Sequence, residues 1–396
     1  MSNTERLSWL ANAVKPSETL ALSAKAGELK AAGRTVYNFT AGQPDFNPPP
    51  SVIAAAKKAV DQGFHKYTPV DGLPAVKEAV AQWHQRCYGV TPALDQIVIC
   101  PGAKPAIDLS LMAIINPGDE VIIPAPYWVS YPTMVAMSGG TSVVVKTRAE
   151  NGYRVTAAEI AAAITPKTRC ILLNSPNNPS GAVARPEEVR AIYELARQAD
   201  CFVISDDIYC KLVYGDTGFF SMGSLPGWEE RVAVINGVSK TYAMTGWRIG
   251  WLVGPRNLAR AVTRIQGQVV SNPTAVAQVA AAAALNDPEG DAYCEKNNTL
   301  FARRRDIMHE MLSAMPGVSC TLPDGAFYIL ADVRQVLARM GLACDMDLAQ
   351  LLMERQAVVC VPGSAFGAPD HLRFSFATDE DTIVRGMRAM AEVLTP

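Results

Sequence analysis

The stretch VAVINGVSKTYAMTGWRIGWLVG, Val232 to Gly254, sets a lysine and an arginine between two apolar runs of strand length. The first run, Val232 to Ile235, leads into a polar turn that holds Lys240, and the second, Ile249 to Val253, begins directly after Arg248. A lysine at the rim of a sheet is partly desolvated, which lowers its pKa towards the free amine that a Schiff base needs. An arginine can grip a phosphate with two parallel hydrogen bonds. Taken alone, the lysine is equally a solvated surface charge and the arginine a partner for a carboxylate.

Further apolar runs rich in Ile and Val alternate with helical patterns between about residue 50 and residue 285. The predicted strands are Ile97 to Cys100, Val121 to Ile123, Ser142 to Val145, Cys170 to Leu173, Cys201 to Ile204, Val232 to Ile235, and Ile249 to Val253. Strands that are apolar throughout are buried on both faces, so helices such as the one expected at Pro186 to Ala199 should cover the sheet. We therefore predict an α/β fold, with a mostly parallel seven-stranded sheet in a large domain at residues 50–285.

The pattern changes at about residue 286. A long charged helix is expected at Tyr293 to Met315, followed by short strands at Ala326 to Leu330, Val358 to Val361, and Leu372 to Phe376. The first 49 residues hold one helical pattern, Ala21 to Ala32, but no strand of the main series. Residues 1–49 and 286–396 are therefore predicted to form a smaller, discontinuous α+β domain.

Composition and charge argue against several kinds of partner. The formal net charge of -2 creates no basic field, so neither nucleic acid nor an anionic membrane surface is expected to bind. The longest run of small apolar residues, Ala280 to Leu285, is too short to cross a bilayer, and the N-terminus shows no targeting pattern. The 9 cysteines form no C-x-x-C pair, and several lie in strand-like runs, which favours buried thiols and a cytoplasmic location.

Polar residues follow the predicted strands, where ligands bind in open α/β sheets. NSPNNPSG follows one strand and SDDIY the next, which brings Asn178, Asp206 and Tyr209 to neighbouring strand ends. Pyridoxal phosphate is the group that fits between a Schiff-base lysine and a phosphate-gripping arginine. A carboxylate facing its pyridine nitrogen keeps the ring protonated and able to accept electrons, and Asp206 is our candidate. An Asx-Pro turn and a helix N-cap remain the alternatives for these two motifs.

Three further features fit the same ligand. In PGAKPAI, Gly102 and Ala103 open a helix whose free N-H groups suit a phosphate, although a glycine before a helix is often turn chemistry alone. Trp128, in APYWVSY, is large enough to stack on a pyridine ring. Tyr67, in KYTPVDG, can donate a hydrogen bond to a phosphate. As ordinary core or surface aromatics, the last two would need no ligand.

The motifs TAGQPDF, KYTPVDG, GAKPA, PAPYWVSYP, NSPNNPSGAV, SDDIY, SKTYAMTGWRIG, PDGAFY and HLRFSFA occur together across nearly the whole chain. In this order and spacing they resemble the class I pyridoxal-phosphate aminotransferases, most closely the bacterial aspartate aminotransferase branch. The resemblance implies the fold type I architecture and pyridoxal 5'-phosphate as cofactor. It implies that Lys240 forms the Schiff base, Asp206 pairs with the pyridinium, Tyr209 and Asn178 bind the 3-oxygen, and Trp128 stacks on the ring.

The resemblance also assigns the groups that hold phosphate and substrate. Ala103, Lys104, Ser239 and Arg248 match the phosphate positions, and Tyr67 would reach in from the other subunit of a homodimer. Arg373, in HLRFSFA, matches the arginine that binds the substrate α-carboxylate, with help from the Gly42 backbone, Trp128 and Asn178.

Substrate choice rests on fewer residues. Lys104, Ser17 and Thr19 match the contacts to a distal carboxylate in the aspartate branch, which favours aspartate and 2-oxoglutarate as substrates of a ping-pong transamination. The family usually has GGKQAL where this chain has GAKPAI, and Pro105 both lacks an N-H and fixes φ. Whether Lys104 contacts the substrate therefore depends on whether Pro105 shifts the turn that carries Lys104.

Three other functions compete with this assignment. An aminotransferase for aromatic amino acids or prephenate, and a β-eliminating lyase of the same fold, would keep most of these motifs. A cofactor-binding regulator would need an added DNA-binding domain, for which the 49 residues before Pro50 leave no room.

Overall fold

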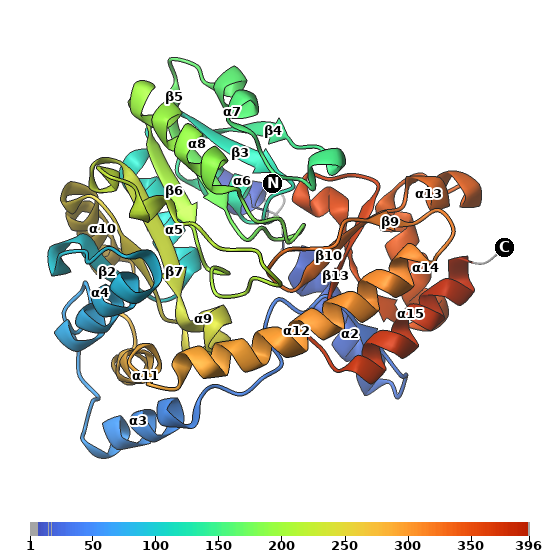
Figure 1. Ribbon diagram of the computed structural model, residues 1–396, viewed down its shortest axis with the longest axis horizontal. Coiled ribbons are helices and arrows are strands. Elements are labelled where there is room, and N and C mark those ends of the chain that lie inside the picture. Colours follow the sequence, from blue (N-terminus) through green and yellow to red (C-terminus); the bar gives the residue numbers. More distant parts are fainter. Residues whose placement is uncertain (1–6, 15, 17, 395–396) are drawn as a thin grey trace.

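The computed structural model describes residues 7–14, 16 and 18–394, and its largest sheet lies at the left and top of Figure 1. The seven strands of this sheet are in the order β2-β8-β7-β6-β5-β3-β4. All run parallel except β8, which is antiparallel to both of its neighbours. Their bounds are β2 (Ile97–Cys100), β3 (Glu120–Ala125), β4 (Thr141–Lys146), β5 (Thr168–Asn174), β6 (Phe202–Asp206), β7 (Val232–Gly237) and β8 (Gly250–Val253). The predicted seven-stranded, mostly parallel α/β sheet is confirmed.

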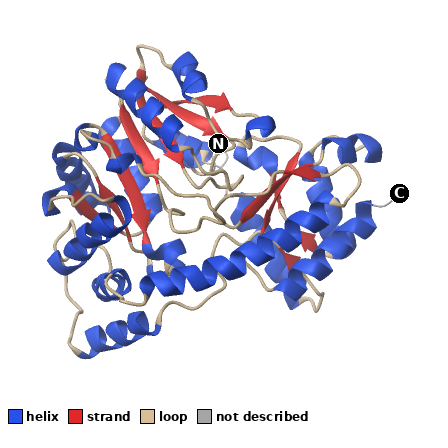
Figure 2. Ribbon diagram, in the orientation of Figure 1, coloured by secondary structure: helices blue, strands red, loops and turns tan. Residues whose placement is uncertain are grey.

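Helices cover both faces of the sheet (Figure 2), because its strands, apart from the partly exposed edge strand β4, are apolar on both sides. In β2, Ile97 and Ile99 pack into the core on one face, and Val98 and Cys100 pack into the core on the other. The helices of this region are α3 (Pro50–Asp61), α4 (Pro74–Tyr88), α5 (Ala103–Ile114), α6 (Tyr131–Met137), α7 (Ala157–Ala163), α8 (Pro186–Gln198), α9 (Val238–Thr241), α10 (Arg256–Val269) and α11 (Ala275–Leu285).

A second core lies around a smaller antiparallel sheet in the order β12-β13-β10-β9. Its strands are β9 (Ser319–Cys320), β10 (Tyr328–Asp332), β12 (Val361–Pro362) and β13 (His371–Ser375), and its helices are α12 (Gly290–Ser313), α13 (Arg334–Met340), α14 (Asp345–Gln356) and α15 (Glu380–Leu394). A short parallel pair joins β1 (Tyr37–Asn38) to β11 (Val358–Val359). This pair and the Phe39 ring, 6.0 Å from the Phe374 ring, attach the N-terminal segment to the C-terminal one.

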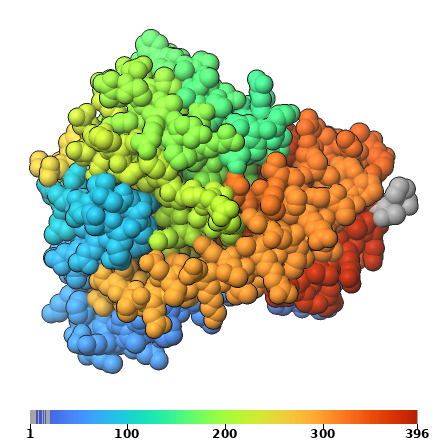
Figure 3. Space-filling view, in the orientation of Figure 1, coloured from blue at the N-terminus to red at the C-terminus, as the bar shows by residue number. Residues whose placement is uncertain are grey.

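The N-terminal helices are α1 (Trp9–Ala13) and α2 (Glu18–Ala31), and α2 packs against β11 and β12 of the C-terminal segment. Helix α12 runs from the region of α9 and α11 to the C-terminal part of the chain (Figure 1), and it is part of the orange surface in Figure 3. None of the helices in the described ranges has both the length and the apolar character needed to span a bilayer.

Two predicted strands differ from the observed ones. The run from Val358 to Val361 is divided between β11 and β12, which belong to different sheets. The strand expected from Ala326 begins two residues later, because Ala326 has a left-handed φ of 55° and ends a turn instead. Side-chain pattern alone carries no signal for either change of backbone direction.

Candidate active site

A cavity of about 350 Å³ opens at the edge of the large sheet where β2, β5, β6 and β7 end. Because β8 runs in the opposite direction, Arg248, which precedes it, lies at this same edge. Of the residues singled out from the sequence, those that line the cavity are Gly42, Ala103, Lys104, Trp128, Asn178, Asp206, Tyr209, Ser239, Lys240, Arg248 and Arg373. Residues distant in sequence therefore meet at one place.

Lys240 is brought to the cavity by the four-residue helix α9, directly after β7. Its Nζ donates to the Gly42 carbonyl oxygen at 2.6 Å. Burial, reinforced by the Arg248 guanidinium, lowers the Lys240 pKa to about 8, although the Asp206 carboxylate opposes this. Near neutral pH, far more of this side chain is free amine than in an exposed lysine, as nucleophilic attack on a carbonyl requires.

Asp206 is the last residue of β6 and is 4% exposed. Its Oδ2 accepts a hydrogen bond from the Tyr131 hydroxyl at 2.6 Å, and its Oδ1 accepts one from the Ile208 amide at 3.2 Å. Burial raises the Asp206 pKa to about 6, while the Tyr131 hydrogen bond stabilises the ionised form. A buried carboxylate of this kind favours a cationic ligand group.

The neighbouring Asp207 is turned away from the cavity, since successive side chains of a strand point to opposite faces. Its two carboxylate oxygens accept hydrogen bonds from the hydroxyls of Ser205 and Ser221, at 2.7 and 2.6 Å. The motif SDDIY therefore supplies one carboxylate to the cavity and one to the core.

We expect Tyr131→Phe to raise the pKa of Asp206, because the variant removes a hydrogen bond to the ionised carboxylate. In the wild-type protein, Asp206 becomes protonated as the pH falls through about 6, and its attraction for a ligand cation is then lost. The affinity of the protein for pyridoxal phosphate, the cofactor expected from the sequence, measured between pH 5 and 8, should therefore begin to fall at a higher pH in the variant. Tyr127→Phe, outside the cavity lining, is the control. Superimposable pH profiles for all three proteins would contradict this role of Tyr131.

Arg373 is 2% exposed in strand β13. Its Nη1 donates to Asn178 Oδ1 at 3.1 Å and its Nη2 to the Thr40 carbonyl at 2.9 Å, while its guanidinium lies 4.5 Å from the centre of the Tyr328 ring. Among the described residues, no carboxylate forms an ion pair with Arg373, and its Nε has no hydrogen-bond partner. A buried cation with an unused donor favours an anionic ligand such as a carboxylate.

Tyr209 and Tyr328 meet beside this arginine, with their hydroxyl oxygens 3.0 Å apart. Asn178 is held by its own amide, which donates to Asn174 Oδ1 at 2.8 Å, and Asn174 in turn donates to the Asp206 carbonyl at 3.0 Å. Hydrogen bonds between adjacent strand ends thus fix the position of the amide, while the two phenols hold each other through their hydroxyls.

Arg248 packs against the first turn of helix α5. Gly102, which precedes the helix, has a φ of 110°, and a Cβ there would lie 2.9 Å from the Arg248 Cζ. Glycine is therefore required for the guanidinium to approach the free N-H groups at the start of α5. With Ser239 on the same cavity wall, these groups form a cradle suited to a phosphate.

Lys104 lines the cavity from the same first turn. Its Nζ donates to Ser130 Oγ at 3.1 Å and lies 4.7 Å from the centre of the Trp128 ring. Pro105 occupies the third position of α5, where no backbone N-H is needed for an intrahelical bond. The helix accommodates the proline, and the Lys104 side chain remains at the cavity wall.

Tyr67, which was predicted to serve the other subunit, does not line the cavity of its own chain. Tyr67 lies on an outer loop, 90% exposed, and borders a different hollow with Val270 and Asn272. Ser17 and the side chain of Thr19 lie outside the described residues.

Several residues that line the cavity were not predicted from the sequence, among them Tyr131, Tyr328, Asn174 and Ser130. Tyr131 and Tyr328 lie within two of the motifs that were recognised, APYWVSY and PDGAFY. Their position in these motifs was the available signal, but only the fold shows what their hydroxyls contact.

A lysine of lowered pKa, a buried carboxylate, a phosphate cradle and an unpaired arginine at a sheet edge define an enzyme site for amino-acid chemistry. In agreement, residues 34–390 match the family "Aminotransferase class I and II". The chain belongs to this family and is an aminotransferase with the fold type I architecture.

Several relatives match over nearly their full length. The aspartate aminotransferase of Geobacillus stearothermophilus is 41% identical over 93% of this chain and 93% of its own. The aspartate/prephenate aminotransferase of Cereibacter sphaeroides is 43% identical over 93% of this chain and 94% of its own. The structure of aspartate aminotransferase from Thermus thermophilus with maleate superposes with a TM-score of 0.93, at 38% identity, over 98% of this chain and 99% of that one.

Proposed function

We propose that this enzyme transfers the amino group between aspartate and 2-oxoglutarate with pyridoxal 5'-phosphate as cofactor. The observation that carries the proposal is the pairing of Arg373 with Lys104 in one cavity. The buried arginine suits the α-carboxylate that all substrates share, and the lysine suits a second, distal carboxylate. The printed names of the relatives support this choice of substrate.

The residues present fit the cofactor. The Gly102 cradle with Arg248 and Ser239 would hold its phosphate, Asp206 its pyridinium nitrogen, Asn178 and Tyr209 its 3-oxygen, and Trp128 one face of the ring. When bound, the cofactor supplies an aldehyde carbon that accepts the amino group and a ring that stores an electron pair.

The chain's own groups then act on the substrate. Arg373 orients the substrate through its α-carboxylate, which sets the α-carbon hydrogen towards the Lys240 amine. Lys240 takes that proton as a general base and would deliver it, as an acid, to the cofactor carbon that receives the amino group, and its lowered pKa suits both roles near neutral pH. Trp128 shields one side of the cavity from water. Tyr209 and Tyr328 keep the hydrogen bond between their hydroxyls while negative charge passes from the substrate to the ring.

We further propose that the enzyme acts as a homodimer in which Tyr67 completes the phosphate cradle of the partner. Its 90% exposure and its distance from the cavity of its own chain support this arrangement. Large apolar side chains are also exposed at Phe64, Val269 and Val270, as expected for a surface covered by another subunit. We also propose that residues 50–285 form one domain and that residues 1–49 and 286–396 together form another. The cysteine pattern supports a cytoplasmic location.

We expect Lys104→Ala to raise KM for aspartate and 2-oxoglutarate much more than KM for phenylalanine. A charge-assisted contact of about 1.5 to 3 kcal/mol corresponds to roughly ten- to a hundredfold in kcat/KM. Arg373→Ala is the contrast, because loss of the α-carboxylate contact should weaken all substrates alike. If Lys104→Ala weakened aspartate and phenylalanine equally, the lysine would serve the cofactor phosphate alone and the aspartate assignment would lose its main support.

One observation favours a second class of substrate. A second cavity of about 520 Å³ shares Lys104, Val129 and Ser130 with the first, and apolar side chains such as Leu109 and Met134 line much of it. It gives room for a side chain larger than that of aspartate, such as an aromatic one or that of prephenate. The relative named for both aspartate and prephenate supports this alternative. The comparison of KM for aspartate and for phenylalanine in Lys104→Ala distinguishes an aspartate enzyme from one that prefers aromatic substrates.

A further inference from the structure

The loop that carries Tyr67 is held unusually firmly for an exposed segment. It connects α3 to α4, and its tip at Lys66 and Tyr67 is exposed. Behind the tip lie two glutamines, Gln266 of α10 and Gln278 of α11, both 0% exposed. Each donates to backbone or side-chain oxygens of this loop and of a neighbouring segment.

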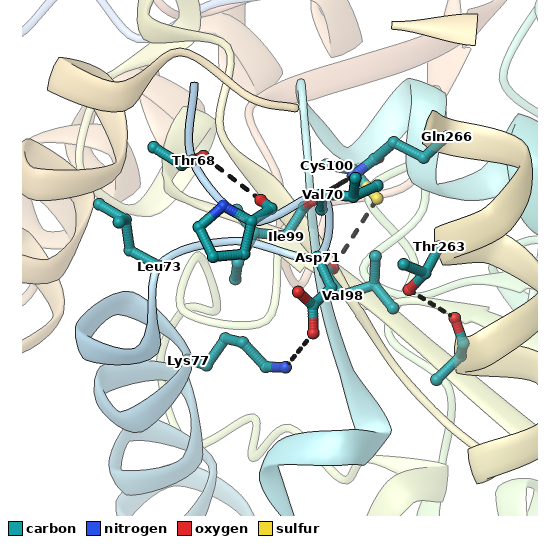
Figure 4. Close-up of polar contacts among 12 residues, drawn as sticks. Thr68, Val70, Asp71, Leu73, Lys77, Val98, Ile99, Cys100, Thr263 and Gln266 are labelled. Atoms are coloured by element: carbon teal, nitrogen blue, oxygen red, sulfur yellow. Dashed lines mark hydrogen bonds and ion pairs between the residues drawn. The ribbon is translucent and has the colours of Figure 1, made fainter. Parts of the chain in front are cut away.

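Gln266 joins the loop to the large sheet (Figure 4). Its Nε2 donates to the Val70 carbonyl at 2.7 Å and to the Ile99 carbonyl of β2 at 2.8 Å. The Ile99 amide donates in turn to the Asp71 carbonyl at 3.0 Å. Strand β2 forms the edge of the sheet, so the loop and this amide satisfy polar groups that would otherwise be left unpaired.

Gln278 holds the loop on both sides of its turn. Its Oε1 accepts from the Leu73 amide at 2.7 Å, and its Nε2 donates to Thr68 Oγ1 at 3.0 Å and to the Pro273 carbonyl at 2.9 Å. Thr68 directly follows Tyr67 in the sequence. The glutamine therefore holds the side chain next to the exposed phenol and, at Leu73, the backbone at the other end of the turn.

The turn itself leaves little freedom. The Gly72 amide donates to the Pro69 carbonyl at 3.0 Å, and Gly72 has a φ of 103° that strongly favours glycine. A Cβ on Gly72 would lie 2.7 Å from the Ile99 Cβ, so no other residue fits. Lys77 of α4 forms an ion pair with Asp71 (Figure 4).

We infer that Gln266 and Gln278 are positioning residues that hold the loop at residues 66–73 rigid, so that the Tyr67 hydroxyl is presented to the phosphate site of a second copy of this chain. The inference rests on the proposed dimer and on the proposed contact of Tyr67. A side chain that is fixed before binding loses less entropy when it binds, so a rigid loop gives tighter binding of the phosphate.

The burial of these amides supports a positioning role. The Oε1 of Gln266 has no hydrogen-bond partner among the described residues, which costs free energy that an apolar side chain would avoid. The amide instead donates two hydrogen bonds, one to the loop and one to β2. Because β2 ends just before Gly102, the same residue links the loop to the chain's own phosphate cradle.

A double-mutant cycle tests this inference. The dissociation constant of pyridoxal phosphate, measured by absorbance titration, should rise about tenfold in Tyr67→Phe and about three- to tenfold in Gln278→Met. In the double variant, Gln278→Met should add almost nothing to the effect of Tyr67→Phe, because the hydroxyl that it positions is already gone. Amide hydrogen exchange should also be faster for residues 66–73 in Gln278→Met.

Gln96→Met is the matched control. Gln96 is also buried, but its side chain accepts a hydrogen bond from the Ala93 amide within its own turn, and no hydrogen bond between described residues joins it to the loop. Its effect on the dissociation constant should stay within about twofold. Should Gln278→Met fail to fold, Thr68→Val removes the same hydrogen bond from the outer side of the loop and should give the same non-additive result.

Heterodimers test independently whether the loop of one subunit acts on the cofactor site of the other. Heterodimers would be isolated with two different affinity tags, one subunit carrying Lys240→Ala so that only the other site forms the Schiff base, whose visible absorption reports binding at that site alone. With Gln278→Met in the subunit that keeps Lys240, that site receives an intact loop from its partner and should bind the cofactor normally. With Gln278→Met in the Lys240→Ala subunit, the same site should be weakened.

The outcomes separate the inference from the proposal on which it rests. If Tyr67→Phe left the dissociation constant unchanged, the proposed contact of Tyr67 would be wrong. If Tyr67→Phe weakened binding but the two variants were additive, or if both heterodimers behaved alike, the contact would stand and the positioning role of Gln278 would be overturned.

Discussion

Lys240→Ala is expected to lower the turnover number for transamination by roughly 10⁴-fold or more. By the proposed mechanism, the variant removes both the amine that binds the cofactor covalently and the base that moves the α-proton. The phosphate cradle and Asp206 remain, so the variant should still bind pyridoxal phosphate without a covalent link. Steady-state kinetics and an equilibrium titration of the cofactor measure the two effects separately.

Two lysine variants control for loss of charge and of packing. Lys240→Arg keeps the positive charge, but a guanidinium has no free amine near neutral pH, so it should be as inactive as the alanine variant. Lys211→Ala removes a lysine outside the cavity that pairs with Asp291, and it should retain most of the activity. Turnover of Lys240→Ala near the wild-type rate would show that the base lies elsewhere.

Asp206→Asn should lower kcat by roughly 10²- to 10³-fold, the magnitude typical of removing one preorganised electrostatic contact. Asparagine has the same shape and can still accept from Tyr131, but it cannot pair with a pyridinium. Asp206→Glu keeps the charge and should lose far less than Asp206→Ala. The comparison of these variants isolates the charge of the side chain from its packing.

Asp207→Asn is the control for this experiment, because the adjacent carboxylate is also buried but faces away from the cavity. It should lower thermal stability more than turnover, since its partners are Ser205 and Ser221. Equal and small losses of kcat in both asparagine variants would mean that Asp206 serves only its local hydrogen bonds.

The sequence predicts the large sheet well because burial on both faces leaves a local signal. Each strand from β2 to β8 is a short apolar run, and the polar residues that follow these runs must meet at one edge when the strands are parallel. Arg248 shows the limit of this reasoning. Its place beside α5 depends on β8 running against its neighbours, which the composition of β8 does not reveal.

Contacts between distant segments are the part that the sequence did not predict. Asp206 and Tyr131 are 75 positions apart, and Gln278 and Thr68 are 210 apart. Gln278 interrupts the apolar pattern of the helix Ala275–Leu285, and only its hydrogen bonds to the adjacent loop explain why a glutamine is buried there. The strand shift at Ala326 has a similar origin, since a left-handed φ at a non-glycine residue is set by the surrounding fold.

The most direct test of the central claim is a single half-reaction of the cofactor-loaded enzyme with aspartate alone. An aminotransferase keeps the amino group and releases one equivalent of 2-oxo acid per active site, after which the reaction stops until a second 2-oxo acid is added. We predict this stoichiometric release, with a matching change in the visible absorption and no free ammonia. Continuous release of ammonia from aspartate, or no oxo acid at all, would contradict the account.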